Sequence, residues 1–184
     1  RFIGHIRTEA QRLVALIADI IRLSQLDEGV EMPKENVELL SLAGEVAEDL
    51  RPAADKRSLT ISVDGQTAVV FGVRRLLYEM LYNLCDNAIK YNRPDGSVRI
   101  HVESRAQDAV VSVLDTGIGI ASEHQSRIFE RFYRVDKSHS KASGGTGLGL
   151  SIVKHAAMYH GGKVELESQV GSGTEIRVTL PLPR

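Results

Sequence analysis

The sequence predicts an α/β fold, a two-layer α/β sandwich in which three helices cover one face of a mixed sheet of about five strands. Short apolar segments with a period of two predict the strands, and longer segments with apolar residues three and four positions apart predict the helices. The two kinds of segment follow each other along the chain, which is typical of α/β proteins. A long helix is expected in front of the sandwich.

The composition is that of one globular domain of ordinary size with a small appendage. Of the 184 residues, 42% are apolar and 26% are charged, so the chain can bury a sizeable core. The formal charge of -1 gives no field that would favour nucleic acid or an anionic membrane surface. A single cysteine excludes an internal disulfide framework and indicates a reducing compartment. No apolar run approaches the ~18 residues that a membrane span needs.

Residues 1–29 are expected to form one long helix of a helical bundle, ending at Gly29. The segment lacks proline, and Val14 and Ile21 widen its apolar stripe beyond a two-stranded seam. So wide a stripe is expected to be covered by other protein, although a helix that packs only on its own domain is the alternative. Residues 30–36, interrupted by Pro33, are interpreted as a linker.

The domain proper is predicted to span residues 37–184. Its first expected elements are an edge strand at Glu38–Leu42, a helix at Ser41–Lys56, and strands at Leu59–Val63 and Ala68–Phe71. Asp64-Gly65 is interpreted as the turn between the last two strands. Pro52 argues against a continuous helix, because proline removes a helical hydrogen bond.

The most informative stretch is Y-N-L-C-D-N-A-I-K-Y, residues 82–91, at the end of a helix predicted for Val73–Tyr91. Asn83, Asn87 and Lys90 lie at i, i+4 and i+7 and share one helix face. A second, apolar face that includes Tyr91 is expected to pack on the sheet. Amide oxygens are acceptable Mg2+ ligands and lysine suits phosphates, so the polar face predicts a magnesium-nucleotide site. A merely solvated face is the alternative.

Two glycine-rich stretches agree with a nucleotide site. D-T-G-I-G-I, residues 115–120, follows a hairpin predicted from strands at Val98–Ser104 and Ala109–Leu114. G-G-T-G-L-G-L, residues 144–150, opens a helix predicted for Leu148–Tyr159. Glycines let backbone N–H groups approach phosphate oxygens, and the N-terminus of a helix favours an anion.

The rest of the chain is expected to complete the sheet and to provide a flap. The polar stretch Ala121–Gly145 has few groups that could fix it, which is typical of a mobile functional loop. Gly161-Gly162 should end the last helix. Strands at Lys163–Ser168 and Thr174–Leu180 are predicted to form a final hairpin.

The order and spacing of these stretches, with I-F-E-R-F-Y-R at residues 128–134, resemble the ATP-binding domain of sensor histidine kinases of two-component systems. Residues 82–91 resemble that family's N box, 115–119 its G1 box, 129–134 its F box and 144–149 its G2 box. The resemblance covers residues 37–182, and a weaker one extends to residues 1–29, which resemble the second helix of the dimerisation and phosphotransfer hairpin.

The resemblance implies a protein histidine kinase that uses ATP and Mg2+. It implies Asn87 and Asn83 as metal ligands and Asp115 and Thr174 as adenine contacts. Arg134, with Arg131 as the alternative, would reach the terminal phosphate, and Asn83, Asn87 and Arg134 would be the catalytic residues. The flap would be the ATP lid, anchored by burial of Phe129 and Phe132. The expected nucleotide contacts are Asn83, Asn87, Lys90, Tyr91, Asp115, Gly117, Gly119, Ile120, Arg134, Gly145, Thr146, Gly147, Leu148, Gly149 and Thr174.

The phosphoacceptor histidine is expected to lie outside this chain. The family's acceptor is followed by an acidic residue and, a few positions on, by a proline, and none of the six histidines has that context. The acceptor helix of the same protein is therefore expected upstream, and the chain alone should not autophosphorylate. The resemblance also implies a response-regulator partner and a homodimeric, membrane-bound parent with a cytoplasmic kinase region. No nucleic acid or membrane contact is expected for this segment.

A clamp-type ATPase of the same fold, like gyrase or the chaperone and mismatch-repair enzymes, is the main alternative. Such enzymes carry a glutamate general base four residues before the metal-binding asparagine, and Asn83 at that position cannot take up a proton. Glu79, one helical turn earlier, keeps this alternative open. A serine/threonine kinase of the anti-sigma-factor type and a degenerate nucleotide sensor are weaker alternatives. The helix at residues 1–27 argues against the first, and the intact glycines and asparagines argue against the second.

Overall fold

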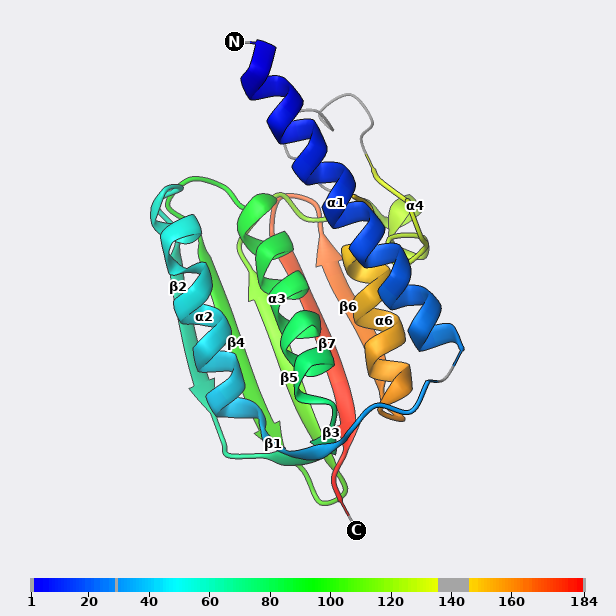
Figure 1. Cartoon of the computed structure of the whole chain (residues 1–184). Helices are drawn as coiled ribbons and strands as arrows, with labels where there is room; N and C mark the ends of the chain where they lie inside the picture. The colour runs from blue at the N-terminus through cyan, green and yellow to red at the C-terminus, as the bar shows by residue number, and fades with distance from the viewer. Residues whose placement is uncertain (1, 29, 136–145, 184) are drawn as a thin grey trace.

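The computed structural model describes residues 2–28, 30–135 and 146–183 and arranges them as helices lying on a sheet (Figure 1). The elements in chain order are α1 (Phe2–Asp27), β1 (Glu35–Glu38), α2 (Leu39–Asp55), β2 (Thr60–Gly65), β3 (Val69–Gly72), α3 (Arg74–Lys90), β4 (Ser97–Ser104), β5 (Asp108–Asp115), α4 (Ser122–Gln125), α6 (Gly149–Tyr159), β6 (Lys163–Gln169) and β7 (Gly173–Pro181).

Five strands form the main sheet in the order β2-β4-β5-β7-β6, and β1 and β3 form a separate antiparallel pair. β2 runs parallel to β4, whereas the other neighbours are antiparallel. The predicted mixed sheet is thereby confirmed, as are the β4–β5 and β6–β7 hairpins.

The turn predicted at Asp64-Gly65 is wrong. Gly65 is the last residue of β2, and the next backbone N–H, that of Gln66, donates to the Val102 carbonyl of β4 over 2.7 Å. Gly65 has φ 125°, and a Cβ atom there would lie 2.0 Å from the Val102 carbonyl oxygen. The glycine therefore allows two backbones to approach closely, a role that glycine often has within a strand.

The edge strand predicted at Glu38–Leu42 is also wrong, apart from its first residue. The Glu38 carboxylate accepts hydrogen bonds from the backbone N–H groups of Leu40 (2.9 Å) and Ser41 (2.7 Å) and so caps α2. A cap satisfies amides that have no partner within the helix, which starts the helix directly after Glu38. Contrary to the expectation, the helix continues through Pro52 as far as Asp55, so the loss of one helical hydrogen bond at the proline does not end it.

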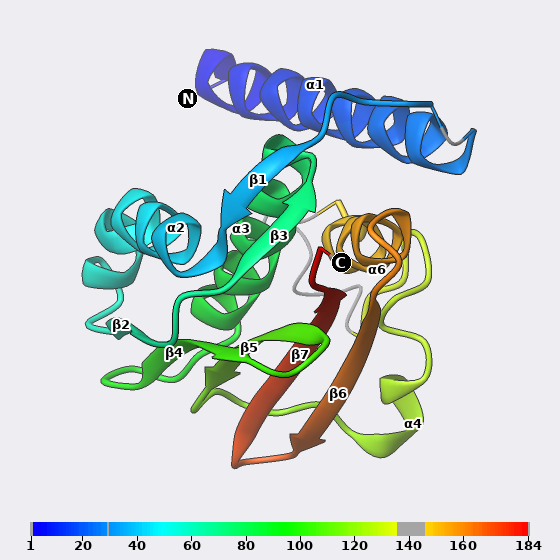
Figure 2. The same cartoon turned by 90° about the horizontal axis from the view of Figure 1, so that it is seen from below.

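Helices α2, α3 and α6 cover one face of the five-stranded sheet, as predicted (Figure 2). Their inward side chains and the inward side chains of the strands form one continuous apolar core. The apolar face predicted for α3 is confirmed at Leu77, Leu81, Leu84 and Ala88, which are buried. It is wrong at Tyr91, which lies at the end of the helix and is 46% exposed.

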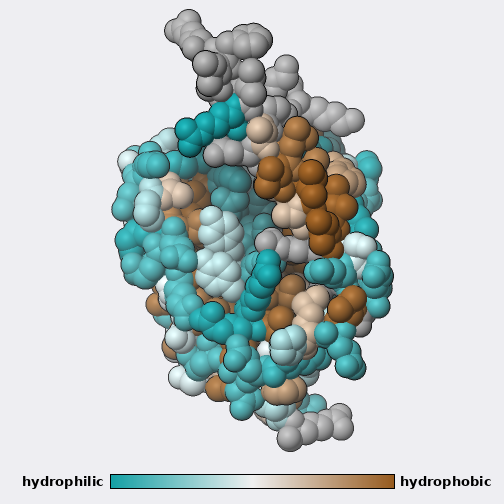
Figure 3. All heavy atoms as spheres, in the orientation of Figure 1, coloured by the Kyte–Doolittle hydropathy of each residue, from teal (hydrophilic) through white to brown (hydrophobic). Residues whose placement is uncertain are grey.

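α1 packs on α6 through only one side. Leu16 and Leu23 of α1 contact Leu148 and Ile152 at the start of α6. Five other apolar residues of α1 remain exposed, and Figure 3 shows the resulting patch over α1: Leu13, Val14, Ile17, Ile20 and Ile21. Gly29, the predicted end of this helix, lies outside the described residues. Within the described part of the chain, no helix combines the length and apolarity that a membrane span requires.

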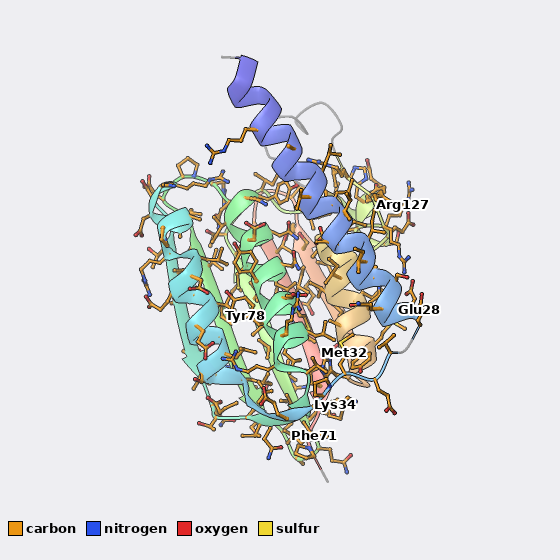
Figure 4. All side chains as sticks on the ribbon, viewed as in Figure 1. Glu28, Met32, Lys34, Phe71, Tyr78 and Arg127 are labelled. Atoms are coloured by element: carbon orange, nitrogen blue, oxygen red, sulfur yellow. The ribbon has the colours of Figure 1, made fainter. Side chains whose placement is uncertain are left out.

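The linker after α1 is attached to the end of α6. Tyr159 Oη accepts the Met32 N–H and donates to the Val30 carbonyl, each over 3.1 Å. The Lys34 ammonium lies 5.2 Å from the centre of the Tyr159 ring, and Figure 4 shows Met32 and Lys34 on this linker. These three contacts fix the linker against the domain.

Candidate functional site

A cavity of about 530 Å³ lies between α3, α6 and the adjoining ends of β5 and β7. Its volume is in the range of small-molecule sites. Most of the residues predicted for a nucleotide site line it: Asn83, Asn87, Lys90, Tyr91, Asp115, Gly119, Ile120, Arg134, Thr146, Gly147, Gly149 and Thr174. Gly117 and Leu148 do not line it, and Gly145 lies outside the described residues.

The polar face of α3 forms one wall. Asn83 and Asn87, a helical turn apart, both face the cavity, and the Asn83 amide is held by donating to the Glu79 carbonyl over 2.9 Å. Lys90 Nζ lies 2.5 Å from a carboxylate oxygen of Asp86, which also lines the cavity. Asp86 was not among the predicted site residues, although its spacing of four residues from Lys90 is typical of a helical ion pair.

Asp115, at the end of β5, is half-buried on the floor of the cavity. Its Oδ1 accepts the backbone N–H of Gly117 over 2.8 Å, and it lies opposite Thr174 of β7 in the sheet register. Burial raises the pKa of Asp115 above its ordinary value, and the backbone hydrogen bonds from Gly117 and Thr174 partly offset that rise. The carboxylate therefore combines fixed orientation with a partly desolvated position.

Ser168 organises the floor of the cavity, and the sequence analysis missed it. Its hydroxyl donates to the Gly173 carbonyl (3.0 Å), accepts the Ile120 N–H (2.9 Å) and lies 2.8 Å from the Thr174 hydroxyl. One serine thus connects the glycine-containing loop after β5 to the β6–β7 hairpin. The alternating apolar and polar residues of β6 could not predict these hydrogen bonds, because the partners of Ser168 include Ile120, which is distant in the sequence.

The glycines after Asp115 are required by close backbone contacts. Gly119 has φ 70°, and a Cβ atom on it would lie 2.0 Å from the Gln169 carbonyl oxygen. Gly117 lies close to the end of α3, and a Cβ atom on it would lie 2.4 Å from the Tyr91 carbonyl oxygen. That same carbonyl accepts the Ile118 N–H over 3.1 Å, so the loop is attached to the end of α3.

The described part of the second glycine-rich stretch forms the opposite rim. The Thr146 hydroxyl accepts the Leu148 N–H over 3.3 Å just before α6 begins. Gly147 has φ 75° and accepts the Phe132 N–H at its carbonyl over 2.9 Å. The Leu148 side chain is fully buried against α1 and not on the cavity wall, because its side chain points toward Leu23 and Ile152.

The segment before the expected lid separates the two arginine candidates. Arg134 lines the cavity, whereas the Arg131 guanidinium donates to Asp27 of α1 over 2.5 Å. Phe129 packs partly buried against the core, as predicted. The predicted burial of Phe132 is wrong, because its φ of 63° turns the side chain outward to 57% exposure while its backbone contacts Gly147. Most of the expected lid, residues 136–145, lies outside the described residues.

α1 contributes an acidic residue that the sequence analysis did not associate with the site. Asp19 lines the cavity, and its carboxylate accepts a hydrogen bond from the Thr146 hydroxyl over 3.1 Å. Asp19 and Asn83 also line a second, open groove of about 860 Å³ between α1, α2 and α3. The cavity and the groove therefore meet at Asp19 and Asn83.

The donor set fits a hard cation that keeps part of its water. Among the described residues, no three His, Cys, Asp or Glu side chains gather in a way that could hold a metal. The amide oxygens of Asn83 and Asn87 also line the cavity, and Mg2+ accepts few protein ligands when phosphates and water complete its shell.

Comparisons with known proteins agree with this geometry. A family model described as histidine kinase-, DNA gyrase B-, and HSP90-like ATPase matches residues 72–184. The sensor-like histidine kinase SenX3 of Mycolicibacterium smegmatis is 39% identical over 183 residues, 98% of this chain and 48% of its own length. The phosphate regulon sensor protein PhoR of Pseudomonas aeruginosa is 37% identical over 95% of this chain and 40% of its own length. The chain spans about half the length, or less, of these relatives.

Solved structures show the same fold. Full-length ShkA in complex with AMPPNP superposes with a TM-score of 0.86 at 27% identity, covering 98% of this chain and 38% of that protein. The catalytic domain of histidine kinase ThkA superposes with a TM-score of 0.72 at 27% identity, covering 82% of this chain and 96% of that domain. The first match includes α1, since it spans nearly the whole chain.

Proposed function

Because this chain belongs to the family of histidine kinase-, DNA gyrase B- and HSP90-like ATPases, we propose that it transfers the γ-phosphoryl group of ATP to a histidine of a sensor kinase. ATP use is a property of the family. The observation that carries the proposal is the cavity itself, whose wall unites the polar face of α3 with both glycine-containing stretches. The histidine kinase names of its relatives favour a histidine as acceptor.

In this proposal the adenine ring lies on the floor of the cavity. The Asp115 carboxylate is held by the Gly117 N–H and can accept a hydrogen bond from the adenine amino group. Thr174 pairs with Asp115 in the sheet register, and its hydroxyl lies 2.8 Å from the Ser168 hydroxyl. Tyr91 lines the same space with 46% of its surface exposed, so its ring is available to the base.

The phosphates lie in this proposal between α3 and the start of α6. Gly147 and Gly149 offer backbone amides without side chains in the way, at the positive end of a helix. Arg134 and Lys90 supply positive charge, and Lys90 must exchange its Asp86 partner for a phosphate oxygen. Positioning and charge neutralisation are the main requirements of phosphoryl transfer.

Asn87, with Asn83 beside it, is proposed to hold Mg2+ through amide oxygens. The metal would neutralise charge on the β- and γ-phosphates and fix their orientation. Asn83 is already fixed in place by its bond to the Glu79 carbonyl. This arrangement requires no carboxylate ligand from α3.

The clamp-type ATPase alternative is disfavoured by the position of Glu79. This glutamate is the remaining candidate for a general base, but it pairs with Arg75 over 3.1 Å and lines the open groove instead of the nucleotide cavity. A general base must come within hydrogen-bond reach of the water that it activates. Transfer to a protein acceptor is therefore the better-supported reaction.

The rest of the signalling system follows from the same proposal. The acceptor histidine would be on an upstream helix of the same protein, and an aspartate of a response regulator would receive the phosphoryl group next. A homodimeric, membrane-bound parent with this region in the cytoplasm is the arrangement that we infer. The exposed apolar side of α1 supports a further helical partner there.

A label-transfer assay tests the proposed function. The chain, Mg2+ and γ-labelled ATP are mixed with a longer version of the protein that includes the upstream helix and carries Asn87→Ala. The expected result is acid-labile, base-stable label on the longer protein, since phosphohistidine has these properties. Free phosphate accumulating without labelled protein would instead support the clamp-type ATPase.

A further inference from the structure

We propose that Asp19 of α1 is a specificity-determining residue that disfavours ATP relative to ADP while α1 is docked on the domain. This inference rests on the proposed function, because it requires the cavity to bind nucleotide. The affinity of the cavity for ATP relative to ADP then depends on whether α1 is docked.

The Asp19 carboxylate lies at the rim of the cavity. It accepts a hydrogen bond from the Thr146 hydroxyl over 3.1 Å, and the same hydroxyl accepts the Leu148 N–H just before α6. The N-terminus of a helix attracts an anion, and phosphates are expected at this rim. A carboxylate from α1 therefore stands at the anion-binding end of the cavity.

Docking of α1 on the domain holds Asp19 at this rim. Leu23 is 2% exposed and packs on Leu148 and Ile152, one turn after Asp19. A further turn on, Asp27 pairs with Arg131 over 2.5 Å and lies 3.3 Å from His155 Nε2. Spacings of four residues place Asp19, Leu23 and Asp27 on one helix face.

A terminal phosphate near Thr146 would bring negative charge close to the Asp19 carboxylate in a partly enclosed space, where like charges repel more strongly than in water. ADP lacks that terminal group and should be affected less. By linkage, a nucleotide that binds worse to the docked form must in turn favour undocking of α1.

Affinity measurements on three forms of the chain test this coupling. Calorimetric titrations with Mg2+ and either ADP or AMPPNP, a non-hydrolysable ATP analogue, are made on the wild type, Asp19→Asn and Glu28→Gln. Asp19→Asn removes the charge and preserves the shape. Glu28→Gln removes a charge of the same kind at an exposed position directly after α1, where Glu28 bonds only to Ser24 among the contacts described for it (Figure 4).

Asp19→Asn should raise the affinity for AMPPNP relative to ADP by about fivefold or more, and Glu28→Gln should leave that ratio unchanged. Hydrogen exchange across residues 13–27 should be faster with AMPPNP than with ADP in the wild type, and this difference should shrink in Asp19→Asn. An unchanged ratio in Asp19→Asn, or weaker AMPPNP binding, would overturn the inference and leave the proposed function standing. If the wild type bound neither nucleotide, the proposed function would fail as well.

Discussion

The side-chain oxygen of Asn83 lies 2.9 Å from the point where a Cβ atom on Gly149 would stand. Asn83 cannot withdraw freely, because its amide nitrogen donates to the Glu79 carbonyl. Gly149→Ala should therefore displace Asn83, and we expect nucleotide affinity to fall by about tenfold or more while the fold persists, since ~1.4 kcal/mol corresponds to tenfold. Calorimetric titration with ATP and Mg2+ measures this loss.

Gly44→Ala in α2 is the matched control for that substitution. No atom lies within 4 Å of the Cβ position on Gly44, so the added methyl group has room. Alanine in the interior of a helix is more stable than glycine by about 0.5–1 kcal/mol. This variant should bind ATP normally and unfold at a higher urea concentration. A loss of ATP binding in both variants would contradict the claim that Gly149→Ala acts by displacing Asn83.

Asp115→Asn should weaken ATP binding and relax discrimination against GTP. The carboxylate accepts hydrogen bonds only, whereas an amide can also donate to the keto group of guanine. Parallel titrations with ATP and GTP give the ratio of affinities, which should move toward one. An equal loss for both nucleotides would contradict a role in reading adenine.

His160 should make the stability of the domain depend on pH. Its Nδ1 bonds to the Ala156 carbonyl (2.7 Å), and its Nε2 accepts the Val73 N–H (2.9 Å), so the neutral ring fits. Burial lowers the pKa of His160 below its ordinary 6.5. The unfolded chain therefore takes up a proton first as the pH falls, and this stabilising contribution, present above 6.5, is lost between 6.5 and the lower folded-state pKa.

Urea unfolding at pH 7.5 and pH 5.5 checks this effect in the wild type and in His160→Gln. One proton contributes a slope of at most about 1.4 kcal/mol per pH unit. The wild type should lose more stability on acidification than the variant, because glutamine keeps hydrogen-bonding groups and does not titrate in this range. Equal losses would show that other groups cause the dependence.

The sequence predicted the parts of the site that depend on local spacing. Asn83, Asn87 and Lys90 share a helix face because the helix repeats every 3.6 residues, and the structure places all three on the cavity wall. The two glycine-rich stretches could also be recognised from the sequence, and Gly119 and Gly147 lie on the same cavity wall. These features can be read without knowing the tertiary fold.

Contacts between distant segments could not be read in the same way. Ser168 reaches Ile120 across 48 residues, and Thr146 reaches Asp19 across 127. Gly65 looked like a turn because its role depends on the neighbouring strand β4, which comes more than 30 residues later. Phe132 looked like a buried anchor because apolarity alone does not reveal its positive φ.

Calorimetric titration of ATP with and without Mg2+, on the wild type and Asn87→Ala, tests the central claim that this cavity holds magnesium-ATP. Asn36→Ala, an exposed change on β1, is the control. The account predicts Mg2+-dependent binding to the wild type and to Asn36→Ala, and loss of that binding in a folded Asn87→Ala protein. Unchanged Mg2+-dependent affinity in Asn87→Ala would contradict the assignment of the metal to this face of α3.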